Sequence, residues 1–260
     1  MKYLLKTVLF LVLCLFTLYS FAQKKDTVVI TADNLRKTEI EYGRLTYIVY
    51  NKKTKDSPAD GIYLVKINIE PTLYNNKNAV SIAQEWDRGD TVIHSAQTVL
   101  NKAGFSTLLH ETYWKRQNYT TKFDFETREV SFKGVVADSI KSKVIQDFNE
   151  SFDHYNLNWH SDLIIFTLLP YKENRVFKIN FYDPGFGKAS EEIYSVTGSD
   201  MLKGPSGKKI DCWILEIKIP SINGYQKFWV DKKSNEVLKE EDFYNNMYRY
   251  KLKLEVSEIN

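Results

Sequence analysis

Apolar and charged side chains alternate along several segments of this chain, and this alternation constrains its fold more than any other feature. In residues 61–69, Tyr63 and Val65 fall on one face of an extended backbone, whereas Lys66 falls on the other. The same period of two residues recurs in segments 45–50, 106–114, 176–182 and 249–256. Strands with one apolar and one charged face typically pair in antiparallel sheets that keep one side in water.

Turn-forming residues separate these segments and give about eleven strands. Asp, Asn, Gly, Pro and Ser cluster in residues 55–61, 183–185, 204–207 and 231–235, and the last turn joins 228–230 to 236–238 as a hairpin. Because no long helical segments alternate with the strands, a βαβ architecture is poorly supported. On the last strand, the alternation places Arg249, Lys251 and Lys253 on the wet face.

One segment, residues 161–169, is predicted to be a helix that is apolar on every side. Ser161 can cap its start, Asp162 suits its first turn, and Pro170 ends it. Such a helix has no face for water, so we expect the concave side of a curled sheet to cover it, with Phe166 near its centre. Segment 78–100 is interpreted as strand, and segment 138–152 fits a helix or a strand.

The first residues indicate export. A basic start, Met1 to Lys6, precedes 16 uncharged residues that end in Ser20-Phe21-Ala22, which predicts a signal peptide in residues 1–22 with cleavage before Gln23. Sixteen residues are fewer than the roughly 20 that span a bilayer, so we expect no stable membrane insertion after cleavage, although a retained anchor stays open. The remaining residues, 23–260, then form one periplasmic or secreted β domain without repeat or linker.

Composition excludes some functions. Lys and Arg total 36 and Asp and Glu total 33, so the chain lacks the strong basic excess that nucleic-acid binding needs. We therefore expect no nucleic-acid partner. The segment 204–209 resembles a phosphate loop but lacks the first Gly and the final Ser or Thr, and a strand follows it. We therefore expect a turn there, and no cofactor.

Neither the histidines nor the cysteine predicts catalysis. His154 and His160 lie near Asp153 and Asp162, but regular structure cannot bring imidazoles six residues apart to one metal ion. His94 and His110 are interpreted as surface or satisfied core histidines. Cys212, the one cysteine after residue 22, lies on a strand with two apolar faces, so we expect a buried, unreactive thiol. We predict no catalytic residues and no metal ligands.

Several motifs in the second half of the chain carry a family resemblance. They are Trp-His-Ser-Asp at 159–162, Leu-Leu-Pro-Tyr-Lys at 168–172, Asn-Phe-Tyr-Asp-Pro-Gly at 180–185, Tyr-Ser-Val-Thr-Gly at 194–198 and Phe-Trp-Val-Asp at 228–231. Over residues 159–241 the chain resembles a family of exported bacterial proteins, a domain of unknown function, similar in fold to the lipoprotein carriers LolA and LolB. The resemblance implies an open antiparallel β half-barrel wrapped around one or two short helices, with an apolar cavity and no established catalytic residues. The style of the cleavage site resembles that of Bacteroidetes proteins.

The residues in or beside the expected helix and strands are the candidates for lining that cavity. They are Trp159, Leu163, Phe166, Trp213 and Trp229. Aromatic side chains of this kind either fill a core or line a concave site for an apolar ligand. We therefore expect a non-enzymatic binder or carrier of a hydrophobic, lipid-like ligand in the cell envelope. The alternatives are an envelope interaction or assembly module that fills its own cavity and binds a protein partner, and a hydrolase or metal enzyme.

Overall fold

A computed structural model describes residues 26–204 and 207–254. Its strands are β1 (Asp26–Val29), β2 (Gly43–Lys52), β3 (Asp60–Tyr74), β4 (Lys77–Arg88), β5 (Thr91–Asn101), β6 (Thr107–Trp114), β7 (Tyr119–Asp124), β8 (Glu129–Lys133), β9 (Leu157–Asn158), β10 (Arg175–Tyr182), β11 (Ser190–Lys203), β12 (Lys209–Ile219), β13 (Gly224–Asp231), β14 (Val237–Tyr244) and β15 (Met247–Leu254). The α-helices are α2 (Asp138–Glu150) and α3 (Asp162–Thr167), and short 3-10 turns are η1 (Lys37–Glu39), η2 (Ser151–Asp153), η3 (Trp159–Ser161) and η4 (Pro220–Ile222). The signal expected in residues 1–22, its cleavage before Gln23, and Val256 lie outside the described residues.

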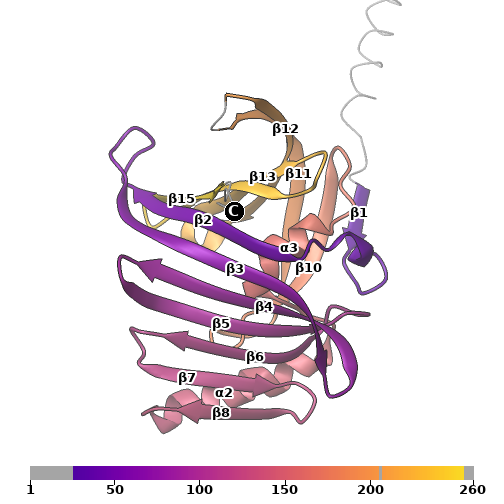
Figure 1. Ribbon diagram of the computed structural model, residues 1–260, viewed down its shortest axis with the longest axis vertical. Helices are drawn as coiled ribbons and strands as arrows, with labels where there is room; N and C mark the ends of the chain where they lie inside the picture. Colours follow the sequence, from indigo (N-terminus) through magenta and orange to yellow (C-terminus); the bar gives the residue numbers. More distant parts are fainter. Residues whose placement is uncertain (1–25, 205–206, 255–260) are drawn as a thin grey trace, which may run out of the picture.

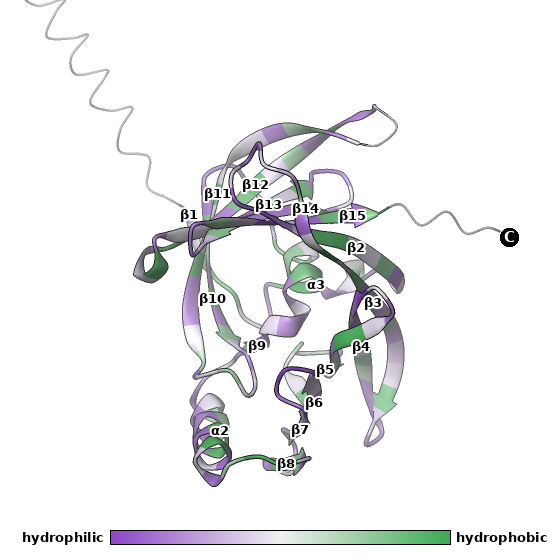
Figure 2. Ribbon diagram, turned by 90° about the vertical axis from the view of Figure 1, so that its left-hand side faces the viewer, coloured by the Kyte–Doolittle hydropathy of each residue, from purple (hydrophilic) through white to green (hydrophobic). Residues whose placement is uncertain are grey.

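The strands form one open sheet from two meanders. Strands β2 to β8 pair in chain order, β10 to β15 do the same, and the last strand, β15, pairs antiparallel with β2 to join them. Short β1 and β9 add to β10 in parallel, so the expected antiparallel pairing holds elsewhere in the sheet. The sheet curls around α3, which lies on its concave side, and α2 lies near β8 (Figure 1 and Figure 2). The expected mostly β half-barrel around two short helices is confirmed.

The described strands number fifteen, so the expectation of about eleven was too low. Strands β1 and β9 have too few residues to show a period. Segment 78–100 holds two strands, β4 and β5, because Gly89 takes a positive φ of 69° and turns the chain back on itself. Segment 138–152 is mainly helix α2, whose buried Val144 and Phe148 are one turn apart.

Helix α3 fills the centre of the half-barrel. Its Leu163, Ile164, Ile165 and Phe166 are all buried, in one core with residues of β2 to β5 and β10 to β14. The expectation of a helix enclosed by the sheet is therefore confirmed. The helix is shorter than the expected 161–169, because residue 161 belongs to η3 and the helix ends at Thr167. The Asn158 side chain accepts a hydrogen bond from the His160 backbone N–H at the start of η3, whereas Ser161 makes no capping hydrogen bond with the described residues.

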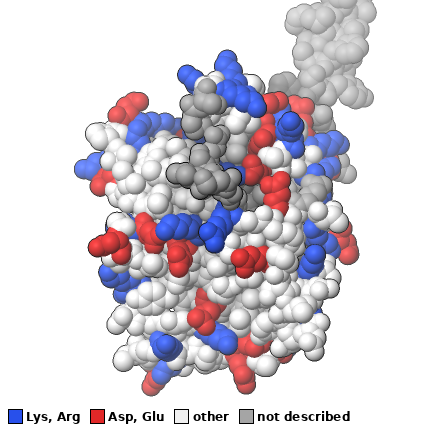
Figure 3. All heavy atoms as spheres, in the orientation of Figure 1, with Lys and Arg blue, Asp and Glu red and all other residues white. Residues whose placement is uncertain are grey.

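The helices and the surface charges are also relevant to what a membrane span or a charged partner would need. Among the described residues, no helix has both the length and the apolar character that a membrane span needs. On the face shown in Figure 3, basic and acidic side chains are interspersed.

Cys212 is buried on the convex side of the sheet with Ile214 and Trp229. This burial was expected, because both faces of its strand are apolar.

Candidate functional site

A cavity of about 360 Å³ lies between α3 and the concave face of the sheet. Both meanders and the α3 region contribute to its walls. The lining residues are Val65, Gln84, Trp86, Trp114, Arg116, Trp159, His160, Asp162, Leu163, Asp183, Phe186, Gln226, Glu240, Arg249 and Lys251. The cavity therefore depends on the junction of β15 with β2, which brings the two halves of the sheet together.

Tryptophans form one side of this cavity. The rings of Trp86 on β4 and Trp114 on β6 meet edge to face, with centroids 5.3 Å apart. Trp159 approaches from η3 and packs edge to face on Phe181, with centroids 5.1 Å apart. The indole nitrogen of Trp114 is buried and has no hydrogen-bond partner among the residues that the structure describes. This wall offers aromatic faces together with one free N–H donor.

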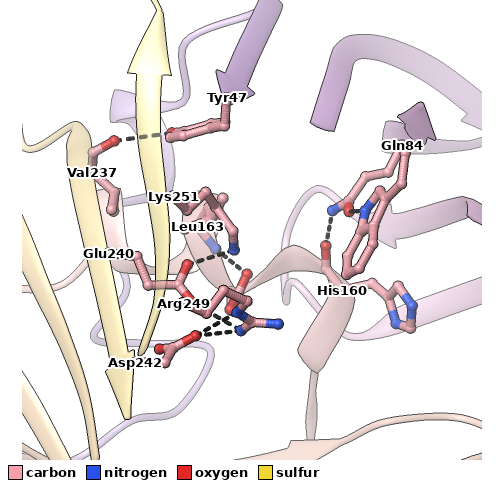
Figure 4. A network of polar contacts seen from close by, with 11 residues as sticks. Tyr47, Gln84, His160, Leu163, Val237, Glu240, Asp242, Arg249 and Lys251 are labelled. Atoms are coloured by element: carbon pink, nitrogen blue, oxygen red, sulfur yellow. Dashed lines mark hydrogen bonds and ion pairs between the residues drawn. The ribbon is translucent and has the colours of Figure 1, made fainter. Parts of the chain in front are cut away.

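Buried ions form the other side of the cavity. Glu240 and Asp242 on β14 lie opposite Lys251 and Arg249 on β15 in the antiparallel register. Lys251 Nζ lies 2.5 Å from Glu240 Oε2, and Arg249 Nη2 lies 2.5 Å from Asp242 Oδ2 and 3.2 Å from Glu240 Oε1. Figure 4 shows these four side chains pointing toward one another, with His160 and Gln84 across from them. The two carboxyl groups are almost wholly buried, so the group is held together by its own pairing.

Burial and mutual charge set the protonation of this ionic group. Burial and the neighbouring Glu240 raise the pKa of Asp242 to about 8, so Asp242 is mainly protonated at neutral pH. Burial opposes the charge on Glu240, but Lys251 and Arg249 outweigh it and hold the pKa of Glu240 below its ordinary value. Burial raises the pKa of Asp162 to about 6. At neutral pH, two cations therefore face the two carboxylates of Glu240 and Asp162.

This arrangement corrects the expected orientation of the last strand. Arg249 and Lys251 were placed on the wet face, but they line the cavity, and the side chain of Lys251 is only 11 % exposed. Charged residues face inward here because the Glu240 carboxylate on the neighbouring strand compensates their charge and Asp242 accepts a hydrogen bond from Arg249 Nε at 2.7 Å. Tyr250 instead lies near Tyr50, with ring centroids 5.3 Å apart.

Two of the five residues predicted to line the cavity do so, and the other three lie elsewhere. Trp159 and Leu163 line the cavity. Phe166 is fully buried in the core, with its ring centroid 4.8 Å from that of Phe228. Trp213 is half-buried against the core, under the Lys232 ammonium at 4.5 Å. Trp229 belongs to the convex cluster, and its indole N–H donates to Asp200 at 2.9 Å.

Register explains why Trp229 lies outside the cavity. Trp229 pairs with Ile214 and Trp213 pairs with Val230, so Trp229 faces the convex side whereas Trp213 shares the concave side with the core. Trp213 packs against that core and is not among the residues that line the cavity. Sequence reasoning missed Trp86, Trp114 and the ionic group. A signal for the ionic group existed, because a two-residue turn at Asn245 and Asn246, both with positive φ, fixes the register that opposes its charges.

The histidines are also distributed differently from expectation. His154 is exposed and takes no part in the cavity, whereas His94 and His110 are wholly buried beside His160. His94 fits the interpretation as a satisfied core histidine at one ring nitrogen, because its Nδ1–H donates a hydrogen bond to the Tyr113 carbonyl oxygen at 2.8 Å. His110 Nε2 is buried with no hydrogen-bond partner, so that histidine is not a fully satisfied core residue.

Comparisons with solved structures give several likenesses of low identity. The chain is 10 % identical to the hypothetical lipoprotein YmcC from Escherichia coli, with coverage of 84 % of this chain and 89 % of that one and a TM-score of 0.30. It is 9 % identical to a β-barrel-like protein of domain of unknown function DUF1849 from Brucella abortus, with coverage of 82 % and 97 % and a TM-score of 0.36. It is 8 % identical to a LolA superfamily protein from Nitrosomonas europaea, with coverage of 87 % and 92 % and a TM-score of 0.24.

The family comparison covers most of the chain. No curated protein matches it. One family model, described as a protein of unknown function, DUF3108, matches residues 46–254, which include both meanders, α3 and every residue that lines the cavity. The resemblance to a family of unknown function is thus confirmed, and the chain belongs to the DUF3108 family.

Proposed function

We propose that this protein is a non-catalytic binder in the bacterial cell envelope that holds a small amphipathic ligand in the cavity beside α3. One observation carries the proposal: a single cavity of about 360 Å³ joins a wall of three tryptophans to a group of buried ions. Small-molecule sites are typically concave, preformed and largely aromatic, with a few polar groups that fix the ligand. The apolar part of the ligand would contact Trp86, Trp114 and Trp159.

The size of the cavity limits the ligand. Sites for small molecules typically measure about 300–1,000 Å³, so this one is near the lower end. Helix α3 already fills the centre of the half-barrel, where Ile165 and Phe166 are fully buried. A short acyl or ring-containing ligand therefore suits the site better than a lipid with two long chains.

The charges favour an uncharged polar head group. Three basic residues line the cavity, Arg116, Arg249 and Lys251, and three acidic ones balance them, Asp162, Asp183 and Glu240. A charged ligand would upset this balance in a poorly solvated site. The buried Trp114 indole N–H and Gln226 Oε1 lack partners, so a head group with hydroxyls would satisfy one donor and one acceptor.

The filled centre of the half-barrel favours one alternative, an assembly module without a ligand. Leu168 and Leu169, which follow α3, are buried with Phe166, so α3 and the residues after it supply the side chains that an acyl chain would otherwise provide. This alternative predicts that no small molecule binds the cavity. Both candidates place the protein in the envelope, on the strength of the signal expected in residues 1–22.

Native mass spectrometry of protein purified without detergent tests the proposal, together with tryptophan fluorescence during titration with 1-octanoylglycerol. We expect saturable binding that weakens about tenfold in Trp159→Phe. Trp213→Phe is the matched control, because Trp213 lies outside the cavity, and it should bind as the original protein does. Octanoate, which has the same chain and a charged head, should bind more weakly. Absence of any saturable binding would favour the assembly module.

A further inference from the structure

Three of the four histidines converge in the interior beside the cavity. Their rings come from three elements, His94 from β5, His110 from β6 and His160 from η3. The ring centroid of His160 lies 5.2 Å from that of His94 and 4.8 Å from that of His110. His94 Nε2 and His160 Nε2 are 3.2 Å apart. His94 and His110 are wholly buried, and the His160 side chain is 8 % exposed.

The outer ring nitrogens determine where the protons lie on the close pair. His94 Nδ1 is 2.8 Å from the Tyr113 carbonyl oxygen, which can only accept, so this nitrogen carries a proton. His160 Nδ1 lies 3.3 Å from Asp183 Oδ1, at ion-pair distance but without hydrogen-bond geometry, and a carboxylate there favours a proton on Nδ1. With that proton on Nδ1, two neutral rings would present Nε2 lone pairs to each other at 3.2 Å. A cation between the rings removes this repulsion, and so does a His160 tautomer whose Nε2–H donates to His94 Nε2.

His110 provides a third ring nitrogen in the same cluster, with its ring centroid 4.8 Å from that of His160. Its Nδ1 lies 2.9 Å from Thr98 Oγ1, which leaves Nε2 as the free end of the ring. That Nε2 is buried without a hydrogen-bond partner, and an unpaired polar atom in the interior costs free energy. His94 and His110 are both fully buried, and burial disfavours the charged form of an imidazole. Neutral imidazole is the form that binds metals.

We propose that His94, His160 and His110 bind a zinc ion through their Nε2 atoms. Zinc–nitrogen distances of about 2.0–2.1 Å in tetrahedral coordination place two ligand nitrogens about 3.3 Å apart, close to the 3.2 Å between His94 and His160. A carbonyl, a hydroxyl and a carboxylate stand at the three Nδ1 atoms. Metal-bound histidines typically have partners of these kinds, which fix the ring and raise its basicity.

The site is formed in part before the ion binds. Within residues 26–204 and 207–254, no three His, Cys, Asp or Glu side chains already gather their ligand atoms around one point as metal ligands do. His94 and His160 hold the spacing, so zinc binding would be completed by a change in the side-chain angles of His110, and water would take the fourth position. The alternative is a proton on His160 Nε2 that donates a hydrogen bond to His94 Nε2, with no metal ion.

Zinc titration of the full protein distinguishes a zinc site from a proton held between His94 and His160. The protein is prepared without a polyhistidine tag, stripped with a chelator and exchanged into metal-free buffer, and zinc binding is followed by isothermal titration calorimetry. We expect one zinc ion per chain. His160→Gln should weaken binding at least tenfold, whereas His154→Gln, the matched control on an exposed histidine, should leave it unchanged.

Two further measurements keep the test decisive if His160→Gln folds poorly. Asp183→Asn alters only the partner of His160 Nδ1, at a side chain 35 % exposed, and should weaken zinc binding about 10–100-fold. Co²⁺ in the original protein should give visible absorption typical of tetrahedral nitrogen coordination and should quench Trp114, whose ring stacks on His94 at a centroid distance of 3.9 Å.

The proposal would be overturned if zinc fails to bind at micromolar concentrations, which assigns a proton to the pair. It would also be overturned if zinc binds equally to the original protein and to folded His160→Gln. Circular dichroism of each variant establishes folding. The titration with 1-octanoylglycerol, run in chelator, tests the amphipathic ligand independently, so failure of one proposal leaves the other intact.

Discussion

Replacing Lys251 with methionine tests whether the buried ionic group acts as one unit. Lys251 is the closest cation to Glu240, with 2.5 Å between Nζ and Oε2, and Glu240 is only 2 % exposed. Methionine keeps an unbranched side chain that is one heavy atom shorter and removes the charge. Glu240 would retain only Arg249 at 3.2 Å, which Asp242 also holds.

The expected loss in the free energy of unfolding is large for a single substitution. Removing one partner of a buried ion pair costs about 3–5 kcal/mol, because the remaining charge stays desolvated. At about 2–4 °C per kcal/mol for a domain of this size, the melting temperature should fall by roughly 10 °C. Lys66→Met is the control, because Lys66 pairs with Asp87 at 2.5 Å but is 53 % exposed, and it should cost at most about 1 kcal/mol.

Urea unfolding at pH 7 measures both losses, and a second variant tests the reasoning. In the double variant Glu240→Gln with Lys251→Met, no uncompensated carboxylate remains, and Asp242 can ionise against Arg249. The double variant should therefore be more stable than Lys251→Met alone, by about 1–2 kcal/mol. The single variant Glu240→Gln completes the cycle. If the losses of Lys251→Met and Glu240→Gln simply add in the double variant, Glu240 and Lys251 are not coupled and the account of this group is wrong.

Three further predictions concern the core, the pH dependence and the thiol. Phe166→Ala should cost about 3–5 kcal/mol in urea unfolding, because the ring is fully buried, whereas Val135→Ala at a 95 % exposed side chain should cost almost nothing; equal losses would contradict the core position. The pKa of Asp242 is raised to about 8, so the folded state keeps a proton that the unfolded state releases, and the stability contributed by this group is present below about pH 4 and falls as pH rises to about 8. Asp242→Asn should flatten that decline in melts collected across this range, and an unchanged slope would assign it elsewhere. Burial raises the pKa of the Cys212 thiol to about 11, so a thiol reagent should label it only after unfolding, and rapid labelling of native protein would refute its burial.

Local pattern was sufficient for much of the fold. The alternation in segments 61–69 and 176–182 identified β3 and β10, because each of these strands buries one face against a continuous core. The all-apolar segment after Ser161 identified α3 and its position inside the sheet, since a helix without a wet face must be covered. These conclusions need only the chemistry of neighbouring residues.

The candidate site depended on pairing between distant residues, and there local pattern was misleading. Alternation in 249–256 separates two faces of a strand but does not say which one is buried. Charge normally marks the wet face, yet Arg249 and Lys251 face inward because β14 presents Glu240 and Asp242 to them. Likewise, Trp86 and Trp114 meet only because β5 lies between their strands and all three curl around η3. Register, which no single segment contains, decides both cases.

The order of the strands also dictates when the cavity can exist. Its tryptophans lie on β4, β6 and η3, but its ions lie on β14 and β15, and β15 is the last strand that the structure describes. That strand must return across almost the whole chain to pair with β2, and such distant contacts form slowly. A growing chain that has made only β2 to β8 would hold two of the three tryptophans of the wall, with an unpaired edge at β2. The binding site and the completion of folding are thus a single event, and a chain that stops short of β15 would have neither.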